Sequence, residues 1–476
     1  MLIARRAARR AAGWAALAIA AACASVPPID RYLLETQPAS VRLQGGHGVL
    51  SRDQAGRILA DLKRRSPDTG ILDRHMAIEE QLAGTPLSVG NRATLLEDGP
   101  ATYAAMLAAI RGARSSIHME MYIFEGGDIG REFAQALAAR RKAGVHVRLI
   151  YDAVGSIDTP KEFFADLESR GVEVAAFNPV SAAKLLEKGA ALDHRDHRKL
   201  VIVDGRIAFL GGINISKVYG SRPRGPAGST PSGAGAPRDA HASVKDRPWR
   251  DTQVRLEGPV VAQLQRLFVA QWAAVRKEPP LGDAALFPPL PAVGNEAVRA
   301  VAETPDDAVD AAYVALISAI ENAETRVLIT NAYFVPAREL LEALERAARR
   351  GVDVELMLPG ESDNWLVLAA GHSYYEDLLE AGVKIHEREN RLLHAKTATI
   401  DGVWSTVGST NLDWRSLVHN DELNAVILSP DFAARMGAMF DRDLAHCKTI
   451  TRASWASRPL GERVKEQAAR AWAHFL

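Results

Sequence analysis

The feature that most constrains this chain of 476 residues is an internal duplication. An apolar run at 117–124, which follows an Ala-rich helical pattern, recurs at 327–334 after a similar helical pattern. In each half a further helical pattern ends in glycine, Gly144 or Gly351, directly before a β-branched run. Glycine is common just beyond the last turn of a helix, and alternating helices and strands are typical of α/β folds. The repeat is far longer than a solenoid unit of about 20–50 residues. The sequence therefore predicts two α/β domains of one kind.

The duplication also divides the chain into segments. The stretch between the halves is rich in proline and glycine, which is typical of a linker. Within the first half, Gly, Pro, Ser and Ala crowd a stretch without a counterpart in the second half, and we expect it to be flexible and mostly dispensable for the chemistry. The predicted segments are 1–24 (a leader), 25–95 (an N-terminal extension), 96–277 (the first domain, with the flexible insert at 220–247), 278–295 (the linker) and 296–476 (the second domain).

The first 24 residues have the pattern of a secretory signal. Arginines up to Arg10 precede an uncharged, Ala-rich run at 11–22, which is shorter than the roughly 20 apolar residues of a membrane-spanning helix. The small residues before Cys23 resemble a bacterial lipoprotein signal, in which the cysteine becomes the lipidated N-terminus. Cleavage at an ordinary small-residue site, or no cleavage, is the alternative. The leader predicts a protein of the cell envelope, with its catalytic body periplasmic or otherwise outside the cytoplasm.

Composition excludes several classes of protein. With 47% hydrophobic and 24% charged residues, the chain is neither disordered nor collagen-like. Its 58 basic and 58 acidic residues balance, which disfavours a broad surface for nucleic acid. Two cysteines cannot form a disulfide framework.

One motif, H-x-K-x4-D-G, occurs once in each half, and an asparagine follows 17 residues after its histidine. The His, Lys, Asp, Gly and Asn positions all recur at one offset of 197 residues, which a chance pair of H-x-K triplets would not produce. On a strand, side chains two residues apart point the same way, so each half presents an imidazole and an ammonium together. The residues are His197, Lys199, Asp204 and Asn214 in the first half, and His394, Lys396, Asp401 and Asn411 in the second.

This set of side chains suits the chemistry of phosphodiesters. A lysine and an asparagine from each half offer fixed donors to the phosphate oxygens, so the reaction requires neither a metal nor another cofactor. One imidazole can attack phosphorus while the other protonates the leaving oxygen, which gives a covalent phosphohistidine.

A nucleophilic histidine needs a carboxylate on its other nitrogen to hold the correct tautomer. Asp251 and Glu422 stand at matching leads into apolar strands, 54 and 28 residues after the histidine of their own half. The insert at 220–247 accounts for this difference. We expect the two acids to orient the histidines, and ordinary surface charges are the alternative.

With these motifs the sequence resembles the phospholipase D superfamily, and within it the bacterial cardiolipin synthases, from about Leu95 to the C-terminus. Further matches are at 151–156, 195–199, 249–259, 332–336, 393–396 and 411–416. The resemblance implies a pseudo-twofold pair of α/β domains with one active site at their interface, and phosphatidyl transfer without a metal. Many cardiolipin synthases begin with two membrane-spanning segments, whereas this chain has only the short leader run.

The resemblance also implies a role for each motif residue. His197 is the expected nucleophile and His394 the expected general acid and base, although pseudo-symmetry leaves the reverse assignment open. The expected phosphate ligands are Lys199, Lys396, Asn214 and Asn411, with Asp204 and Asp401 supporting the motifs from behind.

The leading functional prediction is a phosphatidyltransferase that joins two phosphatidylglycerols into cardiolipin and releases glycerol, or uses a related donor. The alternatives are a phospholipid hydrolase of the same fold, an exported nuclease and a catalytically silent membrane scaffold. Predicted partners are a phospholipid substrate and a membrane surface, without nucleic acid, and no protein partner follows from the sequence. One aromatic group either lines a lipid entrance or belongs to the core: Tyr333, Trp365, His372, Tyr374 and Tyr375.

Overall fold

The computed structural model describes residues 41–66, 69–82, 84–179, 193–220, 247–307 and 310–472. The leader with Cys23, and all of the predicted insert except its two end residues, lie outside these ranges. Within them, no helix is both long and apolar enough to cross a bilayer.

The two halves share one continuous sheet, in which equivalent strands follow the same order outward from the centre. In the first half the strands run β3, β11, β9, β8, β4, β5 and β6, and in the second β12, β19, β18, β17, β13, β14, β15 and β20. The antiparallel pairing of β3 with β12 joins the halves at the centre. The sheet confirms an α/β fold built from two similar units.

The strands of the first half are β3 (Leu87–Glu97), β4 (Ser116–Met121), β5 (His146–Asp152), β6 (Glu173–Phe177), β7 (Arg195–Asp196), β8 (Lys199–Val203), β9 (Ile207–Gly211), β10 (Trp249–Arg250) and β11 (Thr252–Glu257). Its helices are α5 (Asp98–Gly112), α6 (Asp128–Lys142), α7 (Lys161–Ser169), the 3-10 turn η2 (Lys217–Tyr219) and α10 (Val261–Arg276).

The strands of the second half are β12 (Glu296–Glu303), β13 (Arg326–Asn331), β14 (Asp353–Pro359), β15 (Lys384–Arg388), β16 (Leu392–Leu393), β17 (Lys396–Ile400), β18 (Trp404–Gly408), β19 (Asn420–Leu428) and β20 (Cys447–Ile450). Its helices are α11 (Ala311–Glu321), α12 (Arg338–Arg349), α13 (Trp365–His372), α14 (Tyr375–Ala381), α15 (Trp414–Val418), α16 (Pro430–Leu444), α17 (Arg452–Ala456) and α18 (Leu460–Arg470).

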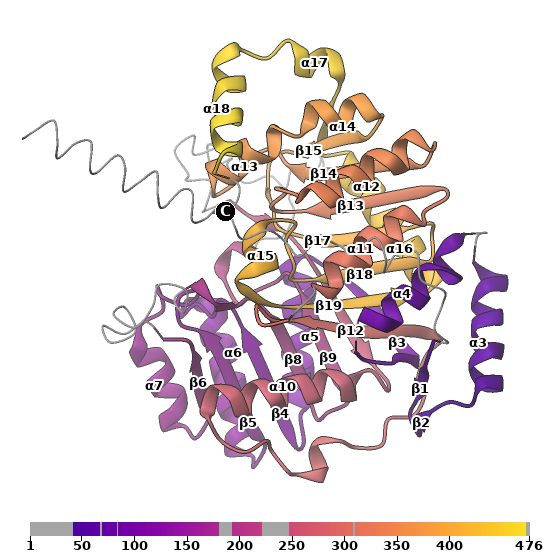
Figure 1. Cartoon of the computed structure of the whole chain (residues 1–476). Helices are drawn as coiled ribbons and strands as arrows, with labels where there is room; N and C mark the ends of the chain where they lie inside the picture. Colours follow the sequence, from indigo (N-terminus) through magenta and orange to yellow (C-terminus); the bar gives the residue numbers. More distant parts are fainter. Residues whose placement is uncertain are drawn as a thin grey trace, which may run out of the picture.

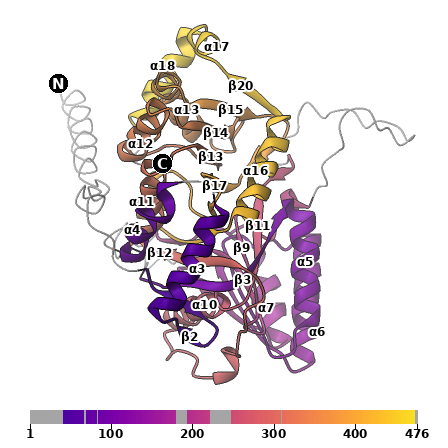
Figure 2. The ribbon, with the colours of Figure 1, turned by 90° about the vertical axis from the view of Figure 1, so that its right-hand side faces the viewer.

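Helices cover both faces of this sheet and produce separate and shared cores (Figures 1 and 2). Side chains of α5, α6 and α7 pack on the first half, and those of α11, α12 and α14 pack on the second. On the other face, α10 and α16 bury one common cluster with strands of both halves, including Phe268 and Phe432. Strand β8 is buried along its whole length, which explains the apolar run that follows Lys199. The shared cluster fixes the halves relative to each other.

The N-terminal extension packs mainly on the second half. It contributes β1 (Leu43–Gly45), β2 (Gly48–Val49), α3 (Arg52–Arg65), the 3-10 turn η1 (Gly70–Leu72) and α4 (His75–Leu82). Arg299 of β12 donates to the Glu80 carboxylate of α4 at 2.6 Å. The predicted boundary at residue 96 falls inside β3, so the end of the supposed extension is a central strand of the sheet.

Candidate active site

The two motif lysines begin equivalent strands in the two halves. Lys199 of β8 pairs with Met121 at the carboxyl end of β4. Lys396 of β17 pairs with Asn331 at the carboxyl end of β13. Each motif therefore lies at the carboxyl ends of the parallel strands of its half, the edge at which α/β sheets bind ligands.

Backbone pairing places each motif histidine against the other half. The N–H of His197 donates to the carbonyl of Asp421 at 2.9 Å, next to the parallel pair β7 and β19. The N–H of His394 donates to the carbonyl of Arg250 at 2.8 Å, next to the parallel pair β10 and β16. Burial and the two motif lysines lower the pKa of His394, and His197 contributes to the same shift. Both halves thus build a single site.

The imidazole of His197 is held by a carboxylate from the second half. Its Nδ1 lies 2.9 and 3.0 Å from the two oxygens of Glu422. The hydroxyl of Ser409 and the amide of Asn420 donate to the same carboxylate. Burial raises the pKa of Glu422 to about 7, and burial also lowers the pKa of His197. When Nδ1–H donates to Glu422, the lone pair of Nε2 is free to face a substrate.

The imidazole of His394 is held from the first half. Its Nδ1 lies 2.8 Å from Oδ2 of Asp251 and 3.1 Å from the hydroxyl of Tyr219. Burial raises the pKa of Asp251 to about 7. Both predicted acids therefore contact the histidines, and each contacts the histidine of the opposite half. Glu422 lies in β19, and Asp251 lies between β10 and β11. The pairing of β19 with β7 and of β10 with β16 brings each acid to the histidine of the opposite half.

The two lysines are buried against aromatic rings. The ammonium of Lys199 lies 5.0 Å from the ring centre of Tyr122, and that of Lys396 lies 6.0 Å from the ring centre of Tyr333. Burial lowers the pKa of Lys199 to about 7 and that of Lys396 to about 8. A bound phosphodiester would favour the charged form of both lysines, since an opposite charge nearby raises the pKa of an ammonium.

The two motif asparagines occupy equivalent positions but have different contacts. Oδ1 of Asn214 accepts from the N–H of Ile123 at 3.0 Å, and its amide donates to the Tyr219 hydroxyl at 3.3 Å. Oδ1 of Asn411 is buried and has no hydrogen-bond partner in the described part of the chain. The asparagine of the first half is thus already part of a network, whereas the side chain of Asn411 is less constrained.

The motif aspartates lie at the far end of their strands, away from the histidines. Asp204 and Asp401 have positive φ angles of 54° and 49° and form tight turns between paired strands, each followed by glycine. The Asp204 carboxylate accepts backbone N–H groups of residues 114–116, and that of Asp401 accepts those of residues 324–326. They fix the start of β4 and β13. Their carboxylates bind backbone at the far end of the strands, which agrees with the expected support of the motifs from behind.

Sequence reasoning singled out Tyr333, whose ring centre lies 6.2 Å from that of His394, but missed the other aromatic side chains around the histidines. The Tyr122 ring lies edge-on to His197, with ring centres 4.9 Å apart, and Trp249 lies 4.8 Å from His394. Tyr219 is fully buried and borders the Gly-rich insert, which hid its importance. A signal was present: Tyr219 follows Asn214 by five residues, as Ser416 follows Asn411.

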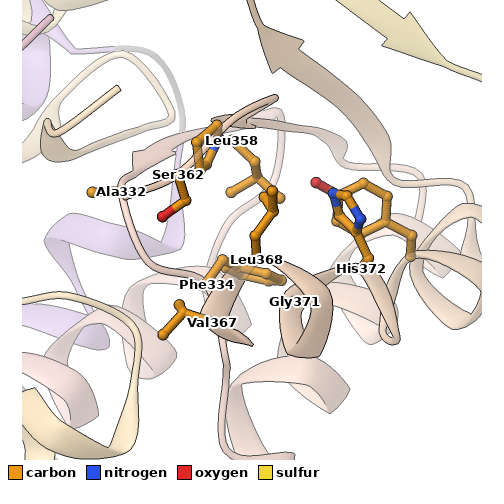
Figure 3. Close-up of a pocket in the computed structure, with 10 residues that line it drawn as sticks. Ala332, Phe334, Leu358, Ser362, Val367, Leu368, Gly371 and His372 are labelled. Carbon is orange, nitrogen blue, oxygen red and sulfur yellow. The ribbon is translucent and has the colours of Figure 1, made fainter. Parts of the chain in front are cut away.

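A small, mostly apolar pocket lies at the carboxyl ends of β13 and β14 and beneath α13 (Figure 3). Phe334, Leu358, Val367 and His372 are among its lining residues, and it includes neither motif histidine. Of the aromatic group predicted for a lipid entrance, Tyr374 and Tyr375 are buried core residues, whereas Trp365 is exposed. His372 lines the pocket, and Tyr333 lies beside Lys396.

Comparisons with known proteins agree with this architecture. The family model described as "Cardiolipin synthase, PLD-like domain" matches residues 106–220 and 316–444, once in each half. A cardiolipin synthase of Alkalihalophilus pseudofirmus is 32% identical over 394 residues, which cover 83% of this chain and 74% of the relative. The major cardiolipin synthase of Bacillus subtilis is 33% identical over 381 residues, covering 80% and 74%. The crystal structure of a phosphatidylserine synthase from Haemophilus influenzae superposes with a TM-score of 0.61 at 12% identity, covering 84% of this chain and 99% of that one.

The fold and the duplicated motif thus define a two-domain enzyme of the phospholipase D type. Within that class, the chain belongs to the cardiolipin synthase family.

Proposed function

We propose that this protein is a phosphatidyltransferase that joins two phosphatidylglycerol molecules into cardiolipin and releases glycerol. The observation that carries the proposal is the crossed pair of contacts, His197 with Glu422 and His394 with Asp251, in a chain of the cardiolipin synthase family. A carboxylate behind each imidazole gives one site two histidines of controlled tautomer. Such a site can both attack phosphorus and manage the proton of the leaving group.

In the first step, Nε2 of His197 attacks the phosphorus of the donor lipid, and the bond from phosphorus to the glycerol oxygen breaks. His394 donates a proton to that oxygen as it leaves. Lys199 and Lys396, with the amides of Asn214 and Asn411, offer donors to the non-bridging oxygens, where negative charge accumulates in the transition state. The product is a phosphatidyl group bound to His197.

In the second step, a hydroxyl of another phosphatidylglycerol attacks phosphorus, and His394 accepts its proton. Water could enter in place of that hydroxyl and would give phosphatidic acid. The histidines are only 7% and 5% exposed, and Tyr122 and Trp249 lie against their rings. This burial favours an acceptor that is held in place over bulk water.

Incubation with phosphatidylglycerol vesicles tests the proposal. We expect cardiolipin and free glycerol in nearly equal amounts, with phosphatidic acid as a minor product. Phosphatidic acid as the dominant product at every lipid density, with no detectable cardiolipin, would show a hydrolase instead. Cleavage of single-stranded DNA without either lipid product would show a nuclease.

We also propose that the site faces a membrane through exposed apolar side chains on both halves. Ile157 follows β5, and Trp365 follows the equivalent strand β14, with exposures of 70% and 69%. Both segments reach the site: the Gly155 backbone packs against Tyr122, and Asp363 accepts a hydrogen bond from the Tyr333 hydroxyl at 2.6 Å. The apolar rim therefore borders the two tyrosines beside the motif lysines.

Helix α18 extends this rim, since it packs against α13 on the same side of the molecule (Figure 1). It exposes Leu460 and Val464, one turn apart, and Trp472 follows it. Five of the seven exposed large apolar side chains of the described chain belong to these segments, so the clustering is not a general property of the surface. Exposed aromatic and aliphatic side chains of this kind insert at the boundary of headgroups and acyl chains.

Sedimentation with phosphatidylglycerol vesicles tests this face. Trp365→Ala combined with Ile157→Ala should weaken binding roughly 100-fold or more, because each apolar side chain fully buried in the bilayer contributes on the order of 1.5–3 kcal/mol and every 1.4 kcal/mol is a factor of about ten. Val49→Ala is the matched control, since Val49 is 69% exposed but lies in β2, outside the rim. Equal binding of the double variant and the control would rule out this face.

Cys23, which lies outside the described residues, is proposed as the lipidated N-terminus that keeps the enzyme at the envelope membrane. Mass spectrometry of the mature protein should find an acylated Cys23, and an unmodified N-terminus further along would indicate export without an anchor.

A further inference from the structure

Asn420 has a buried side-chain oxygen that binds nothing in the described part of the chain. The residue is 5% exposed, and its Oδ1 lacks a hydrogen-bond partner there. Its amide nitrogen donates to Oε1 of Glu422 at 3.2 Å, which fixes the end of the amide that faces the carboxylate. Oδ1 is therefore the end turned away from Glu422. An unpaired buried acceptor is costly to a fold, so its presence beside a catalytic group needs a reason.

Strand β19 presents Asn420 to the active site. Asn420 and Glu422 are two residues apart on this strand, so their side chains lie on one face, and that face meets the imidazole of His197. The equivalent position in the first half is Trp249, which lies directly against His394 with ring centres 4.8 Å apart. Asn420 therefore occupies the matching place on the His197 side.

The two equivalent side chains offer opposite partners for a hydrogen bond. The indole N–H of Trp249 is also buried and also lacks a partner among the described residues. An indole nitrogen can only donate, whereas an amide oxygen can only accept. The oxygen of Asn411 is unused as well, but no described hydrogen bond fixes the direction of its amide. Asn420 is thus the unused acceptor of the site whose direction is set by a second contact.

The chemistry of Oδ1 decides which part of a phospholipid it can bind. The non-bridging oxygens of an ionised phosphodiester can only accept hydrogen bonds, so they suit the lysines and the indole but not this oxygen. A hydroxyl can donate to it, and a glycerol headgroup carries two hydroxyls. The terminal one reacts with phosphorus, whereas the one on the middle carbon takes no part in the reaction and is free to bind. A quaternary ammonium headgroup has no such donor.

We propose that Asn420 is a specificity-determining residue that accepts a hydrogen bond from the middle hydroxyl of the glycerol headgroup. The inference rests on the proposed phosphatidyl transfer and names the part of the lipid that this position recognises. The amide is held in advance, because its nitrogen is bound to Glu422, and binding replaces no described bond of Oδ1. A headgroup without that hydroxyl leaves the acceptor buried and unpaired, which corresponds to a loss of roughly 10- to 100-fold.

Two lipids that differ by one oxygen atom test the proposal. Phosphatidyl-1,3-propanediol keeps the terminal hydroxyl of phosphatidylglycerol and lacks only the middle one. We expect the wild-type enzyme to prefer phosphatidylglycerol in kcat/KM by roughly 10- to 100-fold. Asn420→Ala should remove most of that preference, because the unpaired oxygen is then gone with either lipid. Equal rates of the wild type on both lipids, or a preference that Asn420→Ala retains in full, would overturn the proposal.

Ser409→Ala is the matched control. The Ser409 hydroxyl donates to the same carboxylate of Glu422, so each variant removes one hydrogen bond from that group. We expect Ser409→Ala to slow the reaction of both lipids by the same factor and to keep the preference. If Ser409→Ala lost the preference as well, the discrimination would act through Glu422, and the assignment to the Asn420 oxygen would be wrong. The wild-type comparison needs no substitution, so it decides the question even if a variant misfolds.

The quantity measured is the release of the headgroup alcohol, which occurs whether the phosphatidyl group then passes to a second lipid or to water. If phosphatidic acid were the product, the proposed transfer would fail while the headgroup preference could still be measured. Turnover of neither lipid would refute both proposals.

Discussion

Glu422→Gln should slow the formation of phosphohistidine, although Glu422 and the histidine that it serves belong to different halves. Both oxygens of the carboxylate lie within 3.0 Å of Nδ1 of His197, and Ser409 and Asn420 donate to them as well. Glutamine keeps the shape of the side chain but replaces one carboxylate oxygen with an NH2 group. That NH2 donor would then face the donors that the carboxylate accepts from, which are His197 Nδ1–H and the groups of Ser409 and Asn420. Loss of a hydrogen bond to a charged group costs about 1.5–3 kcal/mol, which corresponds to a rate reduction of roughly 10- to 150-fold.

Rapid quenching with phosphate-labelled phosphatidylglycerol measures this step directly, because the acid-labile phosphoenzyme can be trapped and mapped. The crossed contacts predict that Glu422→Gln slows the appearance of the phosphoenzyme whether the leaving group is glycerol or the less basic p-nitrophenolate, as expected for a damaged nucleophile. Asp251→Asn, the matched variant, should act through His394 and slow the reaction mainly when glycerol leaves. If the two variants showed the opposite patterns, each acid would serve the histidine of its own half and the argument from the structure would fail.

Three further outcomes follow from the same contacts. Asp401→Ala should lower the free energy of unfolding by about 2–4 kcal/mol, because several backbone N–H groups lose their acceptor, while the rate per folded molecule stays near wild type; urea denaturation and active-site titration separate the two effects. Phosphohistidine formation should fall as the pH drops below about 7 and level off near the rate of Glu422→Gln, since the pKa of Glu422 is raised to about 7 and its protonated form cannot accept from Nδ1–H; a pre-steady-state pH series should show this limb in the wild type and not in Glu422→Gln. Millimolar EDTA should leave the rate unchanged, because Lys199 and Lys396 supply the positive charge at the phosphate; loss of activity that Zn²⁺ restores would contradict this.

Much of the site was predictable because the chemistry repeats at a constant spacing. The offset of 197 residues identified both histidines, both lysines and both asparagines, and the matching strand leads identified Asp251 and Glu422. The strand register supports the last equivalence: Gly211 pairs with Gln253 in the first half, and Gly408 pairs with Asn424 in the second, so the two acids stand two residues before equivalent positions. A single sequence can therefore reveal which residues occupy equivalent positions in the two halves.

One sequence does not reveal which residues of the two halves contact each other. Spacing along the chain cannot tell whether Glu422 meets His394, which is 28 residues away, or His197, which is 225 residues away. The choice depends on the pairing of β3 with β12 at the sheet centre and on the core that α10 and α16 share. The motif spacing alone could not assign Asp204 either, because it is also the length of strand β8 and its turn, and only the resemblance implied support of the motif from behind. An aspartate that ends a strand and one that acts on substrate look alike in sequence.

The crossed arrangement explains why one chain can contain two copies of the motif that do different work. In a symmetric dimer of identical halves, both histidines would have the same carboxylate and the same neighbours, and neither could be specialised in advance. Joining the halves in one chain removes that restriction at each position separately. This chain differs at several positions that touch a histidine. Asp251, Trp249 and Tyr219 contact His394 where the second half has Glu422, Asn420 and Ser416. Tyr122 contacts His197 where the second half has Ala332. Each histidine therefore has its own surroundings before a substrate binds.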